Sequence, residues 1–131
     1  MVAADERVRS HRGLVVWQKA MEFTTLIYGL GRELPFEEKY GLVSQMCRAA
    51  ISVPANIAGH GRAAPRELAH FVSIAKGSVM EVETYVMLCV QLGYVSETRV
   101  SEILHRSDEI GRMLTSLRAS AIKRANNQSS S

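Results

Sequence analysis

Apolar residues recur every three or four positions through most of this chain, which is the spacing of residues on one face of an α-helix. Four such segments are distinguished, at residues 13–35, 37–59, 65–93 and 96–124. No segment alternates between apolar and polar residues as a half-buried strand would. Helices of about 20 residues joined by short loops predict an all-α fold, an antiparallel four-helix bundle in up-down-up-down order.

Residues with strong preferences for helix ends mark the boundaries of these segments. Pro35 ends the first helix, because the residue before a proline is pushed away from helical angles. Glu37 and Glu38 then suit the start of the second helix, where carboxylates favour the positive end of the helix dipole. Ser96 is expected to be the N-cap of the fourth helix.

The second segment contains Pro54 inside an apolar run that otherwise continues at helical spacing. A proline removes the hydrogen bond to the carbonyl four residues earlier and crowds it, so we predict a helix that is kinked at this position rather than ended. Ser52 and Asn56 are the local polar groups expected to satisfy the freed backbone. Gly59 and Gly61 then allow the left-handed angles that end a helix.

The first and third segments each carry two adjoining apolar stripes, more than the core of one four-helix bundle requires. A surplus apolar surface of this kind points to self-association. We therefore predict a homo-oligomer in which the surplus stripes lie between subunits, with Trp17, Tyr28 and Tyr85 as anchors.

A chain of 131 residues, 47% of them hydrophobic, suits one domain with a single core. We assign residues 1–12 to a flexible basic arm, 13–124 to the four-helix bundle and 125–131 to a disordered tail. Cys47 and Cys89 lie in apolar runs, which favours buried, reduced thiols. No apolar stretch approaches the ~20 residues of a membrane span, and the first residues lack a secretory signal, so we expect a cytoplasmic protein without membrane contact.

The net charge is +3, and the basic residues gather in residues 1–19 and 99–124. Two interpretations of these basic ends stay open. Arginines spaced along an amphipathic helix can form an ordinary solvated face. They can also form a surface that attracts a polyanion such as a nucleic acid.

Three stretches carry a resemblance to a known family. They read "VWQKAMEFTTLIYGL", "EKYGLVSQMCRAAISVPANIA" and "RELAHFVSIAKGSVMEVETYVMLCVQLGYV". With S-x-P-x-N-I-A and G-S-x-x-E-x-E-T in order, the chain resembles the bacterial four helix bundle family, also called 23S rRNA intervening sequence proteins, over residues 15 to about 117. The signature positions are Pro54, Asn56, Gly77, Ser78, Glu81, Glu83 and Thr84.

The resemblance implies a small cytosolic bundle that assembles as a homopentamer around a central channel. The family is similar to the accessory variability proteins of diversity-generating retroelements, which bind nucleic acid and a reverse transcriptase. This chain departs from the family pattern in the loop at residues 58–65, where an acidic and a basic residue are missing. Arg48, Arg62 and Arg66 remain on or near that loop.

The signature residues are expected to have structural roles. A charged residue on each of two otherwise apolar faces leads us to expect an ion pair between Arg48 and Glu81. Gly77 is expected to allow close approach of a neighbouring helix, and Ser78 to form a local hydrogen bond. Glu81 and Glu83 are two positions apart and face different directions, so they are a poor acid–base pair.

No motif of a catalytic or cofactor site stands out. The four histidines lack metal-ligand spacing such as H-x-x-x-H, and the sequence contains neither G-x-S-x-G nor a phosphate-cradling glycine loop. We therefore expect a protein that is not an enzyme and that has no metal or cofactor.

Two functions of different classes remain. The first is an oligomeric nucleic-acid-binding accessory protein that contacts the backbone of RNA or DNA. The second is an oligomeric scaffold that binds a protein partner without nucleic acid. The candidate nucleic-acid-binding residues are Arg7, Arg9, Arg12, Arg48, Arg62, Arg66, Arg106, Arg112, Arg118, Lys123 and Arg124.

Overall fold

The computed structural model describes residues 14–59 and 64–129. Within these ranges the chain forms no strand, which confirms the prediction of an all-α fold with four long helices. A short 3-10 helix, η2, lies between the first two of them. The elements are α2 (Val15–Arg32), η2 (Phe36–Glu38), α3 (Leu42–Ala58), α4 (Pro65–Gln91) and α5 (Glu97–Ser129).

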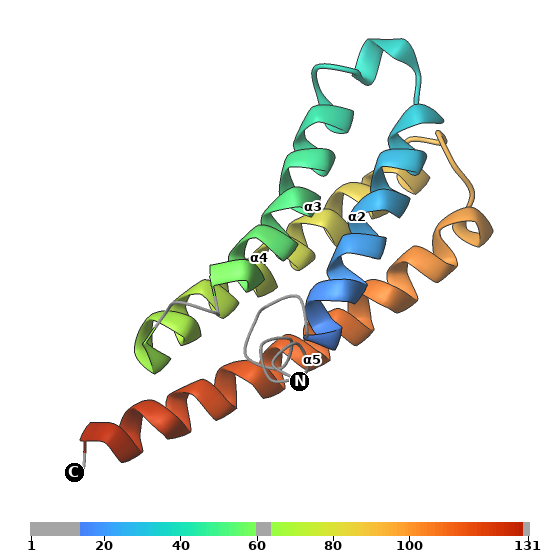
Figure 1. Cartoon of the computed structure of the whole chain (residues 1–131). Helices are drawn as coiled ribbons and strands as arrows, with labels where there is room; N and C mark the ends of the chain where they lie inside the picture. The colour runs from blue at the N-terminus through green and yellow to red at the C-terminus, as the bar shows by residue number, and fades with distance from the viewer. Residues whose placement is uncertain (1–13, 60–63, 130–131) are drawn as a thin grey trace, which may run out of the picture.

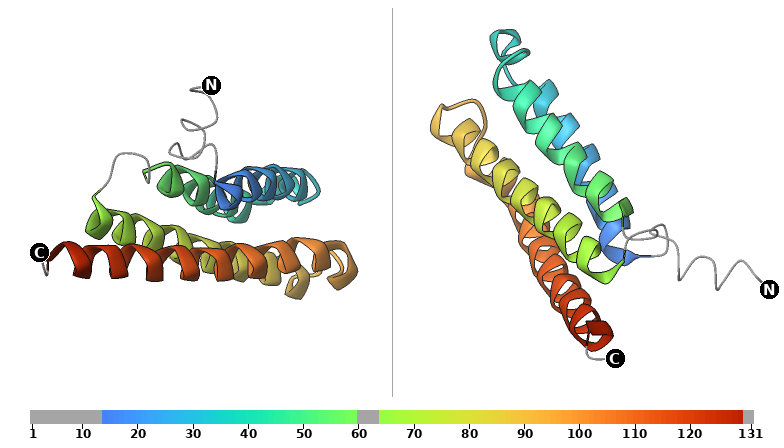
Figure 2. Two further views of the ribbon diagram at one scale, coloured as in Figure 1. Left: turned by 60° about the horizontal axis from the view of Figure 1, so that its bottom comes forward. Right: turned by 90° about the vertical axis from the view of Figure 1, so that its left-hand side faces the viewer.

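The helices lie in two layers, with α2 and α3 in one and α4 and α5 in the other (Figures 1 and 2). α3 packs against both α2 and α4, and α5 packs against both α4 and α2, so the four helices enclose one core. The last part of α5 projects beyond the start of α2 in every view. This projecting part of α5 lies beside the start of α4.

The core is built from the apolar stripes that the sequence pattern predicts. Each helix turns its stripe towards the other three, because burial of these side chains is the main favourable contribution to folding. All four helices contribute large side chains that are almost completely buried. They include Phe23, Ile27, Leu30, Met46, Ile57, Leu68, Val82, Ile110 and Leu114.

The start of α3 differs from the prediction. The helix begins at Leu42, not at Glu37 or Glu38, because the chain leaves Pro35 in an extended conformation and first makes the turn of η2. The carboxylate of Glu38 still acts at the N-terminus of α3, where its Oε1 accepts a hydrogen bond from the backbone N–H of Leu42 at 3.4 Å. Its Oε2 accepts a hydrogen bond from the hydroxyl of Tyr94 at 2.7 Å.

The start of α5 agrees with the predicted cap, whereas the end of α3 differs from the predicted glycine conformation. Ser96 is the N-cap of α5 as predicted, since its Oγ accepts a hydrogen bond from the N–H of Arg99 at 3.1 Å. Gly59 has a φ of −62°, so the expectation of a left-handed angle there is wrong. The glycine instead leaves room for Phe71, because a Cβ at this position would lie 3.1 Å from its ring and the ring would have to shift slightly. Gly61 lies outside the described residues.

α5 is longer than the sequence pattern indicates. We assigned residues 125–131 to a disordered tail, but α5 continues to Ser129. Once a helix is nucleated, each added residue gains one backbone hydrogen bond at small cost, so polar residues extend it without core contacts. Ala121 is the last buried hydrophobic residue of this helix.

The carbonyl freed by Pro54 is satisfied from another helix. α3 continues through the proline, which leaves the carbonyl of Ala50 without its usual backbone donor. The hydroxyl of Thr24 on α2 lies 3.0 Å from this carbonyl oxygen and 2.8 Å from the carbonyl oxygen of Ala20 in its own helix. The single hydroxyl proton is shared between these two acceptors. The expectation that local side chains of α3 satisfy the freed group is therefore wrong.

Candidate nucleic-acid interface

Charge is distributed unevenly along α5. All acidic residues of this helix lie at or before Glu109, and the rest of it carries only basic charge. The start of α4, which lies beside this part of α5, adds two basic residues against one acidic residue, Glu67. We call the resulting cluster the basic end, and it consists of Arg66, Lys76, Arg112, Arg118, Lys123 and Arg124.

Arg106, one of the predicted phosphate contacts, is engaged in ion pairs within the chain. Its guanidinium lies 3.2 Å from the carboxylate of Glu102 and 3.2 Å from that of Glu22. The hydrogen bond to Glu102, followed by the contacts to Glu22, raises the pKa of Arg106. A second pair nearby, between Lys19 and Glu109 at 3.0 Å, also joins α2 to α5. These side chains connect two helices and their charges are compensated.

The arginines of the basic end keep their charge available. The guanidinium of Arg112 lies 3.8 Å from Asp108, and both side chains are 71% exposed, so water screens this pair strongly. Arg118 donates a hydrogen bond from Nε to the hydroxyl of Ser73 at 2.7 Å, which fixes the side chain across α4 without neutralising it. Lys123 and Arg124 are exposed and form no ion pair with described residues.

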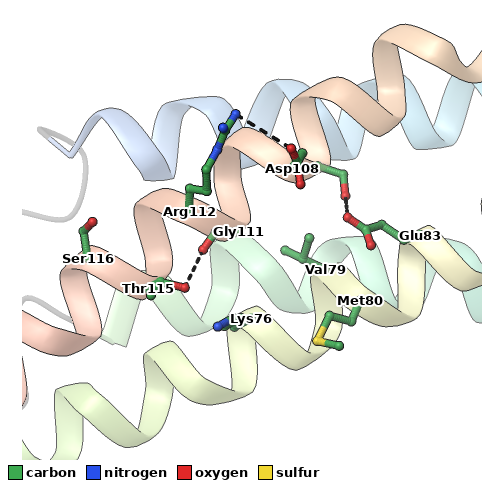
Figure 3. Close-up of a pocket in the computed structure, with 10 residues that line it drawn as sticks. Lys76, Val79, Met80, Glu83, Asp108, Gly111, Arg112, Thr115 and Ser116 are labelled. Atoms are coloured by element: carbon green, nitrogen blue, oxygen red, sulfur yellow. Dashed lines mark hydrogen bonds and ion pairs between the residues drawn. The ribbon is translucent and has the colours of Figure 1, made fainter.

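A groove of about 570 Å³ separates α4 from α5 beside the basic end (Figure 3). Lys76 and Thr115 line one part of it, and Glu83 and Asp108 line the other. A Cβ placed at Gly111 would meet nothing within 4 Å, so the groove is open above this residue. An ammonium and a hydroxyl can hold a phosphate oxygen, whereas the two carboxylates at the other part would repel it.

The remaining predicted contacts fall into two groups. Arg48 lies exposed on α3, away from the basic end, and Arg66 lies exposed in the first turn of α4. Neither forms an ion pair with described residues. The other predicted contacts, Arg7, Arg9, Arg12 and Arg62, lie outside the described residues, as does the basic arm at residues 1–12.

Part of the family signature joins α3 to α4. Asn56 donates from Nδ2 to the carbonyl oxygen of Ser52 at 2.8 Å and to its hydroxyl oxygen at 2.9 Å. The hydroxyl of Ser78, which is only 7% exposed, lies 2.9 Å from the same Ser52 hydroxyl. Ser78 therefore bonds between helices, not locally as predicted.

The other signature residues divide between the inside and the outside of α4. The hydroxyl of Ser107, a buried residue on α5, donates to the carboxylate of Glu83. Thr84 bonds to the carbonyl of Met80 within its own helix at 2.9 Å. Gly77 is exposed, and a Cβ there would meet nothing within 4 Å, so none of the described helices approaches it closely, contrary to the prediction.

The expected ion pair between Arg48 and Glu81 is not present. Both side chains are exposed, and neither belongs to any of the ion pairs among the described residues. The two residues lie on the outer sides of adjacent helices, where water competes for both charges and removes most of the advantage of pairing.

The predicted subunit anchors are only partly exposed. Trp17 and Tyr85 are half-buried and pack against the core of their own chain, and Tyr28 is 39% exposed. Phe36 and Tyr40, which are 76% and 83% exposed, are not among the anchors predicted from the sequence. Phe36 lies in η2 and Tyr40 between η2 and α3, outside the periodic apolar stripes from which the anchors were predicted. The feature of the sequence that could have revealed them is the presence of two aromatic residues within a short polar segment.

Three further features of the described part of the chain concern reactive thiols, metal ligands and membrane-spanning helices. Cys47 is half-buried and Cys89 buried, both thiols are free, and burial raises the pKa of each. Within residues 14–59 and 64–129, no group of three His, Cys, Asp or Glu side chains is placed to hold a metal ion. None of the helices described here combines the length and hydropathy that crossing a membrane requires.

The sequence matches, over residues 12–116, the family described as 23S rRNA-intervening sequence protein. The chain belongs to this family. The resemblance inferred from the sequence is thereby confirmed. A comparison with curated proteins finds no match. The matched range ends before Arg118, so three cations of the basic end lie beyond it.

Proposed function

We propose that this protein is a non-enzymatic, oligomeric accessory protein that binds the phosphate backbone of RNA or DNA through the basic end. The observation that carries the proposal is the lack of any acidic residue on α5 after Glu109, combined with exposed cations that form no ion pair with the described residues, namely Arg66, Lys123 and Arg124. Such contacts supply affinity with little reading of sequence. The family description, which names an rRNA intervening sequence, favours RNA as the first ligand to test.

Oligomerisation belongs to the same proposal. The basic end of one chain offers few phosphate contacts, and repetition around a ring would multiply them. We propose a homopentamer, the number that the family resemblance implies. Within each subunit we propose the up-down-up-down order, which is supported by the packing of each helix on the next and of α5 on α2. We also propose that α3 is bent at Pro54, because a proline inside a helix removes one backbone hydrogen bond.

The lack of catalytic function is also part of the proposal. The most buried polar side chains of the described residues, Ser78 and Ser107, are engaged by Ser52 and Glu83 in contacts between helices. Neither serine lies beside a histidine that could act as a general base in these contacts.

The test is a fluorescence-anisotropy titration of nuclease-treated protein with a structured RNA and with a duplex DNA, at about 50 and 150 mM salt. We expect the affinity for the nucleic acid to fall steeply as the salt concentration rises.

Lys123→Gln combined with Arg124→Gln should lower affinity and reduce the slope of log K against log salt by about 1.4–1.8. The matched control, Arg32→Gln with Arg48→Gln, removes the same charge elsewhere and should leave the slope nearer to wild type. Equal losses in the two variants would contradict the assignment of the basic end.

A second candidate function is a scaffold for a protein partner. The observation in its favour is a set of exposed apolar side chains outside the basic end. No RNA or DNA binding even at about 50 mM salt would favour this scaffold, since phosphate contacts are strongest there. The most exposed of these side chains are Phe36, Tyr40, Met80, Met87 and Leu92.

A further inference from the structure

The segment between α2 and α3 exposes two aromatic rings at the end of the molecule opposite the basic end. Phe36 is 76% exposed and Tyr40 is 83% exposed, more than any other large hydrophobic side chain described. The ammonium of Lys39 lies 5.6 Å from the ring centre of Phe36 and 5.5 Å from that of Tyr40. We call these three residues the aromatic tip. Exposed rings gathered around one cation are typical of an interaction surface.

An apolar groove lies between the end of α4 and the start of α5. Its volume is about 670 Å³, and its apolar lining includes Met87, Val90 and Leu104. Met87 is 59% exposed, so much of this lining faces water in the single chain. Glu97 lines the same groove and forms no ion pair with described residues. We call this the end groove, and it combines apolar walls with one uncompensated carboxylate.

The aromatic tip and the end groove lie at the same end of the bundle. The hydroxyl of Tyr94, in the turn between α4 and α5, donates to Glu38 beside the tip, which holds these two segments together. The tip nevertheless stays exposed, so it does not occupy the groove of its own chain.

We propose that the aromatic tip of one copy docks in the end groove of a second copy, with Lys39 beside Glu97. The rings supply the apolar contact, and the single cation of the tip matches the single carboxylate of the groove. Because the tip and the groove are different surfaces, the contact is head-to-tail and forms a ring when the rotation closes. This inference rests on the self-association contained in the proposed function.

The surroundings of the tip favour a second copy over a nucleic acid. Glu37 and Glu38 lie within two residues of Phe36 and disfavour a phosphate at the tip, whereas the carboxylate of Glu33 is paired with Arg99. The basic end lies at the far end of α5, so docking between tips and grooves leaves its cations free for RNA.

Charge reversal with rescue tests the contact. Light scattering across micromolar concentrations is used to measure the assembly constant of full-length protein. Lys39→Glu and Glu97→Lys should each weaken assembly by about tenfold or more, as expected for groups at the centre of an interface, and the combination should restore much of the loss. The matched control combines Lys39→Glu with Glu81→Lys, which has the same net charge but reverses an exposed carboxylate elsewhere on α4. This control should restore nothing.

Truncation of the rings gives an independent readout. Phe36→Ser with Tyr40→Ser should also weaken assembly, and the helical circular dichroism should be unchanged because both side chains are exposed. Normal assembly in this variant, equal rescue by Glu81→Lys, or a wild-type chain that stays monomeric would each overturn the proposal.

RNA titrations on the same proteins separate this proposal from the proposed function. Loss of RNA binding with normal assembly in the ring variant would assign the tip to base stacking and would overturn docking on a second copy. Rescue of assembly by Glu97→Lys together with a wild-type chain that binds no RNA would support the contact and contradict nucleic-acid binding.

Discussion

Thr24 on α2 and Pro54 on α3 are linked through a single carbonyl group. The proline leaves the oxygen of Ala50 without a backbone donor, and the threonine hydroxyl lies 3.0 Å from it. A buried acceptor without a partner costs about 1–3 kcal/mol, so this one side chain offsets much of the cost of a proline inside the helix. The contributions of Thr24 and Pro54 to stability therefore depend on each other, although the two residues lie 30 positions apart in the sequence.

We predict that Thr24→Val lowers the free energy of unfolding by about 1–2 kcal/mol, because the carbonyl of Ala50 is left unsatisfied. Combining it with Pro54→Ala should recover part of this loss, since the restored backbone N–H at position 54 can bond to that carbonyl. Urea denaturation followed by circular dichroism measures both effects as a double-mutant cycle.

Thr25→Val is the matched control, because the hydroxyl of Thr25 is exposed and bonds only to the carbonyl of Met21 in its own helix. Its effect should stay within about 0.5 kcal/mol. Equal destabilisation by the two threonine variants, or strictly additive effects of Thr24→Val and Pro54→Ala, would contradict the link.

At the scale of elements, one carboxylate joins three segments. Glu38 belongs to η2, it accepts a hydrogen bond from the first residue of α3, and it accepts another from Tyr94 after α4. The hydrogen bond to Glu38, then burial, raises the pKa of Tyr94 above its ordinary value. A raised pKa means that the folded state favours the neutral phenol over the phenolate.

The pH dependence of stability follows from this shift. The contribution of Tyr94 is fully present below the pKa of an unfolded tyrosine, about 10, and is lost as the pH rises through the higher pKa of the folded state. We predict that Tyr94→Phe lowers stability at neutral pH and makes the decline above pH ~10 shallower than in wild type. Denaturant titrations at neutral and alkaline pH measure the difference.

Tyr40→Phe serves as the control for this prediction, since Tyr40 is 83% exposed and its hydroxyl forms no hydrogen bond with the part of the chain that the structure describes. It should leave both the neutral stability and the alkaline decline close to wild type. An alkaline decline that is the same in Tyr94→Phe as in wild type would show that the bond to Glu38 is not the cause.

At the scale of the whole molecule, the two ends of the bundle differ in charge and in surface chemistry. The basic end carries exposed cations, whereas the other end carries the aromatic tip and the end groove. Phosphate binding depends on the release of counterions and falls steeply with salt. Apolar contacts between subunits depend much less on salt at these concentrations.

We predict that raising the salt concentration from about 50 to about 200 mM weakens RNA binding by at least tenfold while the assembled mass stays constant. Anisotropy and light scattering on the same samples measure the two quantities. A mass that falls together with the RNA affinity would indicate that the RNA, not the protein surface, holds the subunits together.

The candidate site could be only partly predicted from the sequence. The cations of α5 were found because their charge is visible along the chain, and the sequence alone could not show that Arg106 is engaged by Glu22 and Glu102. Phe36 and Tyr40 were missed because they lie outside every periodic stripe. The expected ion pair between Arg48 and Glu81 does not form. Two residues can lie at the same height on adjacent helices without contact between their side chains when both side chains face water.

The sequence by itself determined the four helices, their buried stripes and the cap at Ser96, because periodicity and capping depend on residues close together in the chain. Only the tertiary structure decided what satisfies the carbonyl of Ala50, how closely Gly59 approaches the ring of Phe71 and which arginines form no ion pair with the described residues. Each of these depends on a side chain from a different helix or from across a turn, and its position is set by packing rather than by neighbouring residues.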